Sequence, residues 1–222
     1  MPFQMADEPS RAKPSVTTQV FRGHRLFAAL YGVMMLMDRS AFTRTARRYV
    51  AGLAYGDVLE VGAGTGANLA YYTDISSLTL VEPDPYMLRR LHRRLRALRR
   101  HAAIYQSALE QLPFPDQRFD CAVVTLVLCS VADPQAGLAE LRRVLKPGGK
   151  LRFFEHVRVP GWGGRFQEAI TPLWRQIAGG CHLSRDTTVT LQAAGFTIRE
   201  MQTHSVPLPI GRFITGVAER PS

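Results

Sequence analysis

Residues 57–66 read DVLEVGAGTG, and this stretch decides the fold. A short run of β-strand character leads directly into three glycines, Gly62, Gly64 and Gly66. A strand that runs into a glycine-rich turn and then a helix brings bare backbone close to a nucleotide-like ligand. The spacing also satisfies the looser dinucleotide pattern G-x-G-x-x-A. These residues alone therefore leave an NAD(P)-dependent oxidoreductase open.

Glu60, two residues before the first glycine, bears on the choice of cofactor. A carboxylate there would face the doubly negative pyrophosphate of NAD, and that repulsion is costly. S-adenosylmethionine (SAM) carries an ammonium and a sulfonium and no phosphate, so an acid attracts it. Glu82, at the end of the next predicted strand, can accept hydrogen bonds from the ribose of either cofactor. The charge at Glu60 therefore favours SAM.

Beyond Gly56, short β-rich runs alternate with helical stretches. This alternation predicts parallel βαβ units, and hence a doubly wound (Rossmann-like) α/β fold with about seven mostly parallel strands and helices on both faces of the sheet. We expect the turn Pro147-Gly148-Gly149 to stop the helix before it. The predicted strands are 57–61, 77–82, 103–106, 119–125, 150–155, 196–201 and 212–218, and the predicted helices are 66–72, 85–101, 133–145, 166–178 and 186–194.

The 222 residues provide for one α/β domain and a short extension. Residues 1–18 mix Pro, Ser, Thr and charges without an apolar period, which predicts a disordered lead. Residues 19–55 are expected to form an N-terminal helical cap of two helices, broken near Asp38. Residues 56–222 then form the α/β domain. The longest apolar run, Leu26–Met37, is shorter than the roughly 20 residues that span a membrane.

The formal net charge of +10 comes largely from one segment, residues 85–101, which carries seven arginines and no acid. Leu88, Leu91, Leu95 and Leu98 recur there at helical spacing, so the arginines lie on the other faces of the predicted helix. We interpret them as a solvated helix face; a weak peripheral contact with phospholipid headgroups is the alternative. No nucleic-acid partner is expected, because no DNA- or RNA-binding motif accompanies the charge.

Three cysteines, Cys121, Cys129 and Cys181, are irregularly spaced, with no C-x-x-C pair. They indicate a reduced, cytoplasmic compartment and no metal site. A secretory signal is not supported, because Asp38 and Arg39 follow the apolar run where small residues would be expected. A monomer or a homodimer is expected.

Four motifs in order resemble the class I SAM-dependent methyltransferases: VLEVGAGTG (58–66), LVEPDPYML (80–88), ALEQLPFPDQRFD (108–120) and LRRVLKPGGKL (141–151). The resemblance implies SAM as cofactor and S-adenosylhomocysteine as product. Ser107 stands where many relatives carry an acid that accepts from the adenine amino group. The predicted cofactor-binding residues are Glu60, Gly62, Gly64 and Gly66 in the first motif, Asn68 after it, Glu82 at the ribose and Pro83 next to it in the chain, Ser107 and Ala108 at the adenine, and Thr125 and Leu126 at the methionine end.

Three further stretches are similar to the thiol S-methyltransferase branch of the mammalian methyltransferase-like 7 proteins: TLVLCSV (125–131), FFEHV (153–157) and TPLWRQIAGGCHLSRDT (171–187). That branch resembles the quinone C-methyltransferases of ubiquinone and menaquinone synthesis. The resemblance implies a small, apolar acceptor methylated on sulfur, such as a xenobiotic or secondary metabolite. C- or O-methylation of a quinol or phenol, N-methylation of a phospholipid headgroup, and a noncatalytic SAM-binding regulator are the alternatives.

His156, after a predicted strand, is the candidate general base near pH 7, and an orienting or packing role is the alternative. His182 and Asp186 are further catalytic candidates, against a structural role in which Asp186 caps a helix. We expect the acceptor to be bound by residues near the strand ends and in the N-terminal cap, namely Tyr31, Met35, Glu155, Trp174, Cys181 and Arg185.

Overall fold

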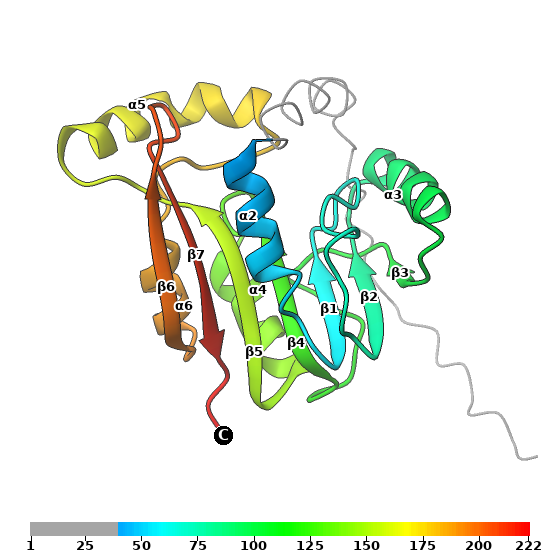
Figure 1. Cartoon of the computed structure of the whole chain (residues 1–222). Coiled ribbons are helices and arrows are strands. Elements are labelled where there is room, and N and C mark those ends of the chain that lie inside the picture. Colours follow the sequence, from blue (N-terminus) through cyan, green and yellow to red (C-terminus); the bar gives the residue numbers. More distant parts are fainter. Residues whose placement is uncertain (1–39) are drawn as a thin grey trace, which may run out of the picture.

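The computed structural model describes residues 40–222, which form one sheet covered by helices. The strands are β1 (Asp57–Val61), β2 (Ser77–Val81), β3 (Ala103–Tyr105), β4 (Phe119–Thr125), β5 (Leu145–His156), β6 (Thr197–Ser205) and β7 (Arg212–Glu219). Their order across the sheet is β3-β2-β1-β4-β5-β7-β6 (Figure 1). The first five strands pair in parallel, and β7 is antiparallel to both of its neighbours. The predicted doubly wound, mostly parallel seven-stranded fold is confirmed.

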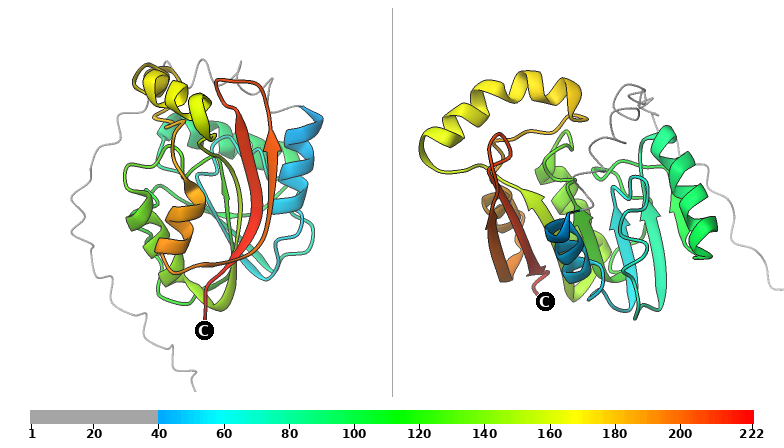
Figure 2. Two further views of the ribbon diagram at one scale, coloured as in Figure 1. Left: turned by 90° about the vertical axis from the view of Figure 1, so that its left-hand side faces the viewer. Right: turned by 45° about the horizontal axis from the view of Figure 1, so that its top comes forward.

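Helices cover both faces of the sheet, as Figure 2 shows. One face carries α2 (Ala41–Val50), which contacts β5 and β7. The other face carries α4 (Pro134–Val144) and α6 (Thr187–Ala193), which contact each other. Beside β2 lies α3 (Pro85–Leu98), and α5 (Gly161–Ile177) crosses the end of the sheet at which the parallel strands finish (Figure 1). Within residues 40–222, α5 therefore covers that end of the sheet on the β5 side.

Buried side chains explain why these elements hold together. On α3, Met87, Leu91 and Leu95 are buried, while most of the arginines face solvent, in agreement with the predicted solvated face. From β5, the buried Arg152 donates to the carbonyls of Tyr49 and Val50 at 2.7 and 2.9 Å. These carbonyls lack a partner within their own helix, so Arg152 fixes the end of α2 to the sheet.

The helix predicted over residues 66–72 is wrong: the structure has successive turns there. The backbone bonds from Leu69 to Gly66 and from Tyr71 to Asn68 span three residues rather than four. Gly66 has a φ of +80°, and the Asn68 side chain binds neighbouring groups instead of facing solvent. Tertiary bonding therefore overrides the short helical pattern.

Two other predicted boundaries move. The turn at residues 147–149 is part of β5, where the pairing with β4 shifts register, and α4 already ends at Val144. The helix predicted from residue 166 begins at Gly161. A Cβ at Gly163 would lie 2.7 Å from the Val159 side chain, so close packing selects glycine here despite its low helix propensity.

Several predictions lie outside the described residues. They are the lead at 1–18, the first helix of the cap, its break near Asp38, and the acceptor-binding roles of Tyr31 and Met35. Within residues 40–222, no helix is both long enough and apolar enough to cross a membrane.

Candidate active site

The glycine turn lies over the carboxyl end of β2. The backbone N–H groups of Gly62 and Ala63 both donate to the carbonyl of Val81, at 2.8 and 3.1 Å. Gly62 and Gly64 have φ values of +66° and +56°, which side-chain-bearing residues rarely adopt. A Cβ at Gly62 would collide with the side chain of Val127. The turn thus needs glycine for its backbone conformation and for its packing against the segment after β4.

Glu82 follows β2 and closes the other side of the turn. Its carboxylate accepts from the N–H of Gly64 at 2.8 Å and from the N–H of Asp84 at 2.9 Å. Burial raises the pKa of Glu82 to about 7. Each carboxylate oxygen accepts more than one hydrogen bond, so Glu82 keeps acceptor capacity for the hydroxyls of a ribose.

Glu60 has protein partners for both carboxylate oxygens. Asn68 Nδ2 donates to one oxygen at 2.9 Å, and the Tyr72 hydroxyl donates to the other at 2.8 Å. The same Asn68 nitrogen lies 3.0 Å from the Thr125 hydroxyl. The Asn68 Oδ1 accepts from the Arg47 guanidinium at 2.7 Å. Burial raises the pKa of Glu60 to about 7. Glu60 therefore acts by orienting Asn68 and Thr125 rather than as an exposed carboxylate.

The remaining predicted cofactor residues border the same end of the sheet. Gln106 donates to the Pro83 carbonyl at 3.2 Å, and the Ser107 hydroxyl donates to the Gln111 carbonyl at 2.6 Å. The predicted adenine neighbour Ala108 is half-buried in this loop. Leu126 has a left-handed φ of +58°, although its N–H still donates to the Phe154 carbonyl at 2.8 Å. Such backbone strain in a bulky residue concentrates at functional sites.

These residues fit SAM. The turn presents bare backbone, Glu82 offers a buried acceptor, and three buried carboxyl groups, Glu60, Glu82 and Glu155, lie at the ends of β1, β2 and β5. Burial raises the pKa of each to about 7, so nearby positive charge would favour their ionised forms. Glu155 Oε2 is buried without a hydrogen-bond partner among the described residues. An ammonium and a sulfonium suit this environment, whereas a pyrophosphate does not.

Glu155 also holds the segment after β4. Its Oε1 accepts from the N–H groups of Val127 and Leu128 at 2.7 and 3.1 Å. The predicted role in acceptor binding stays a prediction. What the contacts establish is that Glu155 positions the turn that carries Cys129.

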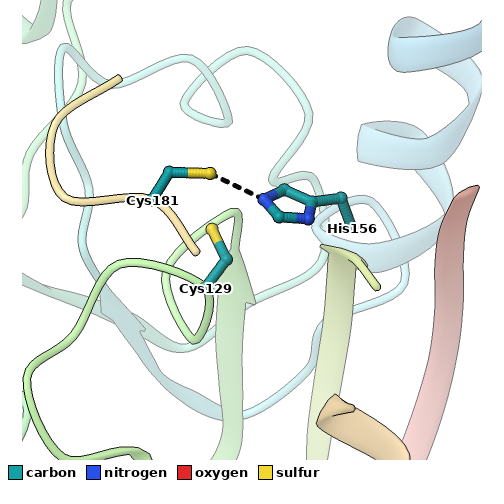
Figure 3. A group of neighbouring side chains, drawn as sticks. All are labelled: Cys129, His156 and Cys181. Atoms are coloured by element: carbon teal, nitrogen blue, oxygen red, sulfur yellow. Dashed lines mark hydrogen bonds between the residues drawn. The ribbon is translucent and has the colours of Figure 1, made fainter. Parts of the chain in front are cut away.

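His156, Cys181 and Cys129 form a cluster at the end of β5, which Figure 3 shows in close-up. His156 Nε2 lies 2.8 Å from Cys181 Sγ, and the side chains of these two residues point toward each other. The ligand atoms of all three residues lie within 4.8 Å of one another. Cys129 comes from the turn after β4, and Cys181 from the loop between α5 and α6. The fold thus brings together three residues that are far apart in the sequence.

The pKa values of the two cysteines in the cluster shift in opposite directions. A hydrogen bond with Cys129 and the contact with His156 lower the pKa of Cys181 below its usual range. The same bond and burial raise the pKa of Cys129. All three cysteines of the chain are free thiols. Cys129 was not predicted as a site residue, although it lies within the motif TLVLCSV at residues 125–131.

The structure gives the other acceptor-side candidates different surroundings. The Asp186 carboxylate accepts from the N–H groups of Thr188 and Val189 and caps α6, as the structural alternative predicted. Arg185 donates to the Leu128 carbonyl at 2.6 Å. Burial lowers the pKa of the His182 side chain. The backbone N–H of His182 donates to the Cys129 carbonyl. Their catalytic or binding roles stay predictions.

An apolar pocket of about 490 Å³ lies along α5. Trp174 lines it and also donates its indole N–H to Cys181 Sγ at 3.3 Å, so the pocket adjoins the cluster. The lining residues come from α5 and the turn before β7; they are Trp162, Phe166, Ile170, Leu173, Trp174, Ile177, Leu208 and Pro209.

The sheet order, the glycine turn and the acid after β2 define a class I SAM-dependent methyltransferase. A family model described as a methyltransferase domain matches residues 59–153. A crystal structure of a methyltransferase from Bacillus halodurans superposes with a TM-score of 0.67 at 17% identity, covering 80% of this chain and 98% of that one. This likeness shows the fold alone. The chain is an enzyme of this class, with SAM as methyl donor and a small-molecule acceptor.

Sequence relatives place the chain more closely. Thiol S-methyltransferase TMT1B of Homo sapiens is 37% identical over 169 residues, which cover 72% of this chain and 69% of the human protein. The ubiquinone/menaquinone biosynthesis C-methyltransferase UbiE of Pseudomonas putida is 29% identical over 163 residues, covering 69% of this chain and 62% of the relative. The chain belongs to the methyltransferase family that includes the thiol S-methyltransferases, and the predicted resemblance is confirmed.

Proposed function

We propose that this enzyme transfers the methyl group of SAM to the sulfur of a small, apolar thiol. The observation that carries the proposal is the contact between Trp174 and Cys181, which joins an apolar pocket to the cysteine–histidine cluster. The 37% sequence identity to the human thiol S-methyltransferase TMT1B also supports sulfur as the nucleophile.

The arrangement suits a thiol because of how little chemistry a thiol requires. SAM supplies, when bound, a methyl group on a positively charged sulfur. The acceptor must present its sulfur in line with that bond and lose its proton. A thiol with a reference pKa of about 8.5 is partly ionised at neutral pH, whereas a phenol or a carbon acceptor needs stronger activation.

Different regions of the chain bind the cofactor and the acceptor. The glycine turn and Glu82 hold the cofactor over the ends of β1 and β2. On the acceptor's side, α5 supplies an apolar surface that includes Trp162 and Trp174. The cluster lies at the end of β5, and its His156 is the candidate general base for the proton of the acceptor thiol.

The test is turnover of methyl-labelled SAM with a panel of thiols, quinols, phenols and aminolipids. We expect labelled product from apolar thiols. Methylation confined to quinols or phenols would keep the fold and the cofactor and overturn the choice of sulfur. Methylation confined to aminolipids, with liposome binding that falls as salt rises, would favour N-methylation of a phospholipid headgroup. It would also favour contact between the arginines of α3 and the membrane surface.

A pair of variants tests the pocket itself. Trp162 lines the pocket and is 73% exposed, so Trp162→Ala removes acceptor-binding surface without opening the core. We expect the acceptor KM to rise by about tenfold, with the KM for SAM unchanged. Leu53→Ala is the control, because Leu53 is also exposed and lies outside the pocket. An acceptor KM that changes equally in both variants would remove the pocket from the proposal.

The finer statements about partners stay predictions from the sequence: a cytoplasmic location, no nucleic-acid partner, and a monomeric or homodimeric state. Gel filtration with light scattering measures the last of these directly.

A further inference from the structure

The cysteine–histidine cluster has the dimensions of a metal site. Its three ligand atoms lie within 4.8 Å of one another. In a four-coordinate zinc site, Zn–S distances of about 2.3 Å and Zn–N distances of about 2.0 Å separate the ligand atoms by about 3.5–3.8 Å. The 2.8 Å between His156 Nε2 and Cys181 Sγ would open to about 3.5 Å around such an ion.

The chemistry of the donors selects the metal. Two cysteine sulfurs and one imidazole nitrogen form a donor set that suits zinc, whereas magnesium and calcium take oxygen ligands. The neighbouring acid, Glu155, does not belong to this group of ligand atoms: its Oε1 accepts from the N–H groups of Val127 and Leu128, and its Oε2 is buried without a hydrogen-bond partner among the described residues. Two thiolates also balance the charge of a divalent ion, so the buried site would be neutral.

The segments that carry the ligands are already fixed. The N–H of His182 donates to the Cys129 carbonyl at 2.7 Å, which ties the loop after α5 to the turn after β4. Arg185 reinforces this link through the Leu128 carbonyl at 2.6 Å. The indole of Trp174 donates to Cys181 Sγ and orients it. Such preorganisation by neighbouring groups is typical of metal sites.

We propose that Cys129, His156 and Cys181 bind one zinc ion with three protein ligands, and that its open fourth position takes the sulfur of the acceptor thiol. Three protein ligands with one open position are the arrangement of catalytic rather than structural zinc. The role of the fourth position rests on the proposed function, whereas zinc binding itself does not.

The zinc ion would activate the acceptor without changing its own oxidation state. The acceptor thiol replaces a water molecule on the ion, and its proton leaves to solvent, since coordination favours the thiolate. The new bond between the acceptor sulfur and the methyl carbon forms as the bond between that carbon and the donor sulfur breaks. The product is a neutral sulfide, a weaker ligand than a thiolate, and it leaves the ion.

The experiment measures metal on the resting protein. The reduced full-length chain is stripped with a chelator, loaded with zinc or with cobalt(II), desalted, and assayed by elemental mass spectrometry and by absorption. We expect about one zinc per chain, a loss of about tenfold or more in Cys129→Ser and in Cys181→Ser, and full binding in Cys121→Ser. Cys121 is the matched control, because it is a buried free thiol in β4 outside the cluster.

Cobalt gives a readout that does not depend on the variants folding. We expect the cobalt-loaded wild-type protein to show thiolate-to-cobalt charge-transfer absorption typical of sulfur ligation. The absence of that absorption, or equal zinc content in the wild type and both cluster variants, would overturn the proposal. So would a reduced protein that takes up no zinc and instead forms a Cys129–Cys181 disulfide on treatment with peroxide.

The outcome is separable from that of the proposed function. Zinc is measured without SAM or acceptor, so a failure of thiol turnover leaves the zinc result standing. Thiol methylation at the full rate by the stripped protein would retain the proposed function and overturn the role of zinc in it.

Discussion

The two halves of the site are built in different ways. The cofactor half uses backbone and acids close to one glycine turn: Gly64, for example, bonds to Glu82, only eighteen residues away. The acceptor half uses side chains from separate parts of the chain, with Cys129, His156 and Cys181 on three different segments. A local motif specifies the first half, and only the completed fold specifies the second. Mutations should therefore separate cofactor binding from turnover.

The largest expected effect is on the cofactor half. Gly64→Val should weaken SAM binding by about 100-fold or more, because a side chain would stand in the cofactor's path. Binding is measured by calorimetry, and folding by circular dichroism. Gly148→Val is the control: both glycines are left-handed, with φ of +56° and +73°, and Gly148 has open space around it. Unchanged SAM affinity in Gly64→Val would remove the glycine turn from the cofactor site.

The acceptor half should respond in the opposite way. His156→Ala should lower kcat by about 100-fold, because the acceptor sulfur loses a group that favours its ionised form. SAM affinity should stay within about twofold, because His156 lies at the end of β5, beyond the glycine turn. His101→Ala, at an exposed histidine after α3, is the control for a simple loss of imidazole. An unchanged kcat would return His156 to an orienting or packing role.

The same contrast explains how much of the molecule could be predicted from the sequence. Strand-and-glycine patterning is local, so the sheet, β1 and the cofactor turn were predicted close to their observed bounds. The helix predicted over residues 66–72 is wrong because the Asn68 side chain forms hydrogen bonds with Glu60 and Thr125. Thr125 is far from Asn68 in the sequence, so the pattern of residues 66–72 alone does not reveal these bonds.

Cys129 shows the limit on the acceptor side. Nothing local distinguishes it from Cys121, which is also a buried free thiol near the same strand. Its proximity to Cys181 depends on the packing of the loop after α5 against the turn after β4. Spacing along the chain therefore indicated no metal ligands, although the folded chain brings three potential ligands together.

A smaller effect concerns the acids of the cofactor half. Burial raises the pKa of Glu82 from 4.5 in the unfolded reference to about 7, so the folded protein holds this proton more tightly. The resulting stability is present below about pH 4.5 and is lost as the pH rises through about 7. The melting temperature of SAM-free protein should therefore fall over that range, and Glu82→Gln should flatten the fall. The stabilisation by SAM should grow over the same range, since its positive charges favour the ionised acids. An equal slope in Glu82→Gln would contradict this account.

The smallest expected effect decides what Asp186 contributes to the acceptor half. Its Oδ1 accepts from the N–H groups of Thr188 and Val189 at 3.1 and 3.2 Å, and Asp133 caps α4 through Gln135 at 2.9 Å in the same way. Loss of either cap should lower the free energy of unfolding by about 1 kcal/mol, measured by urea denaturation of Asp186→Ala and Asp133→Ala. If Asp186 only caps α6, both variants should keep kcat within about twofold. A kcat that falls by about tenfold in Asp186→Ala alone would add this carboxylate to the acceptor half, because Asp133→Ala controls for the loss of a helix cap.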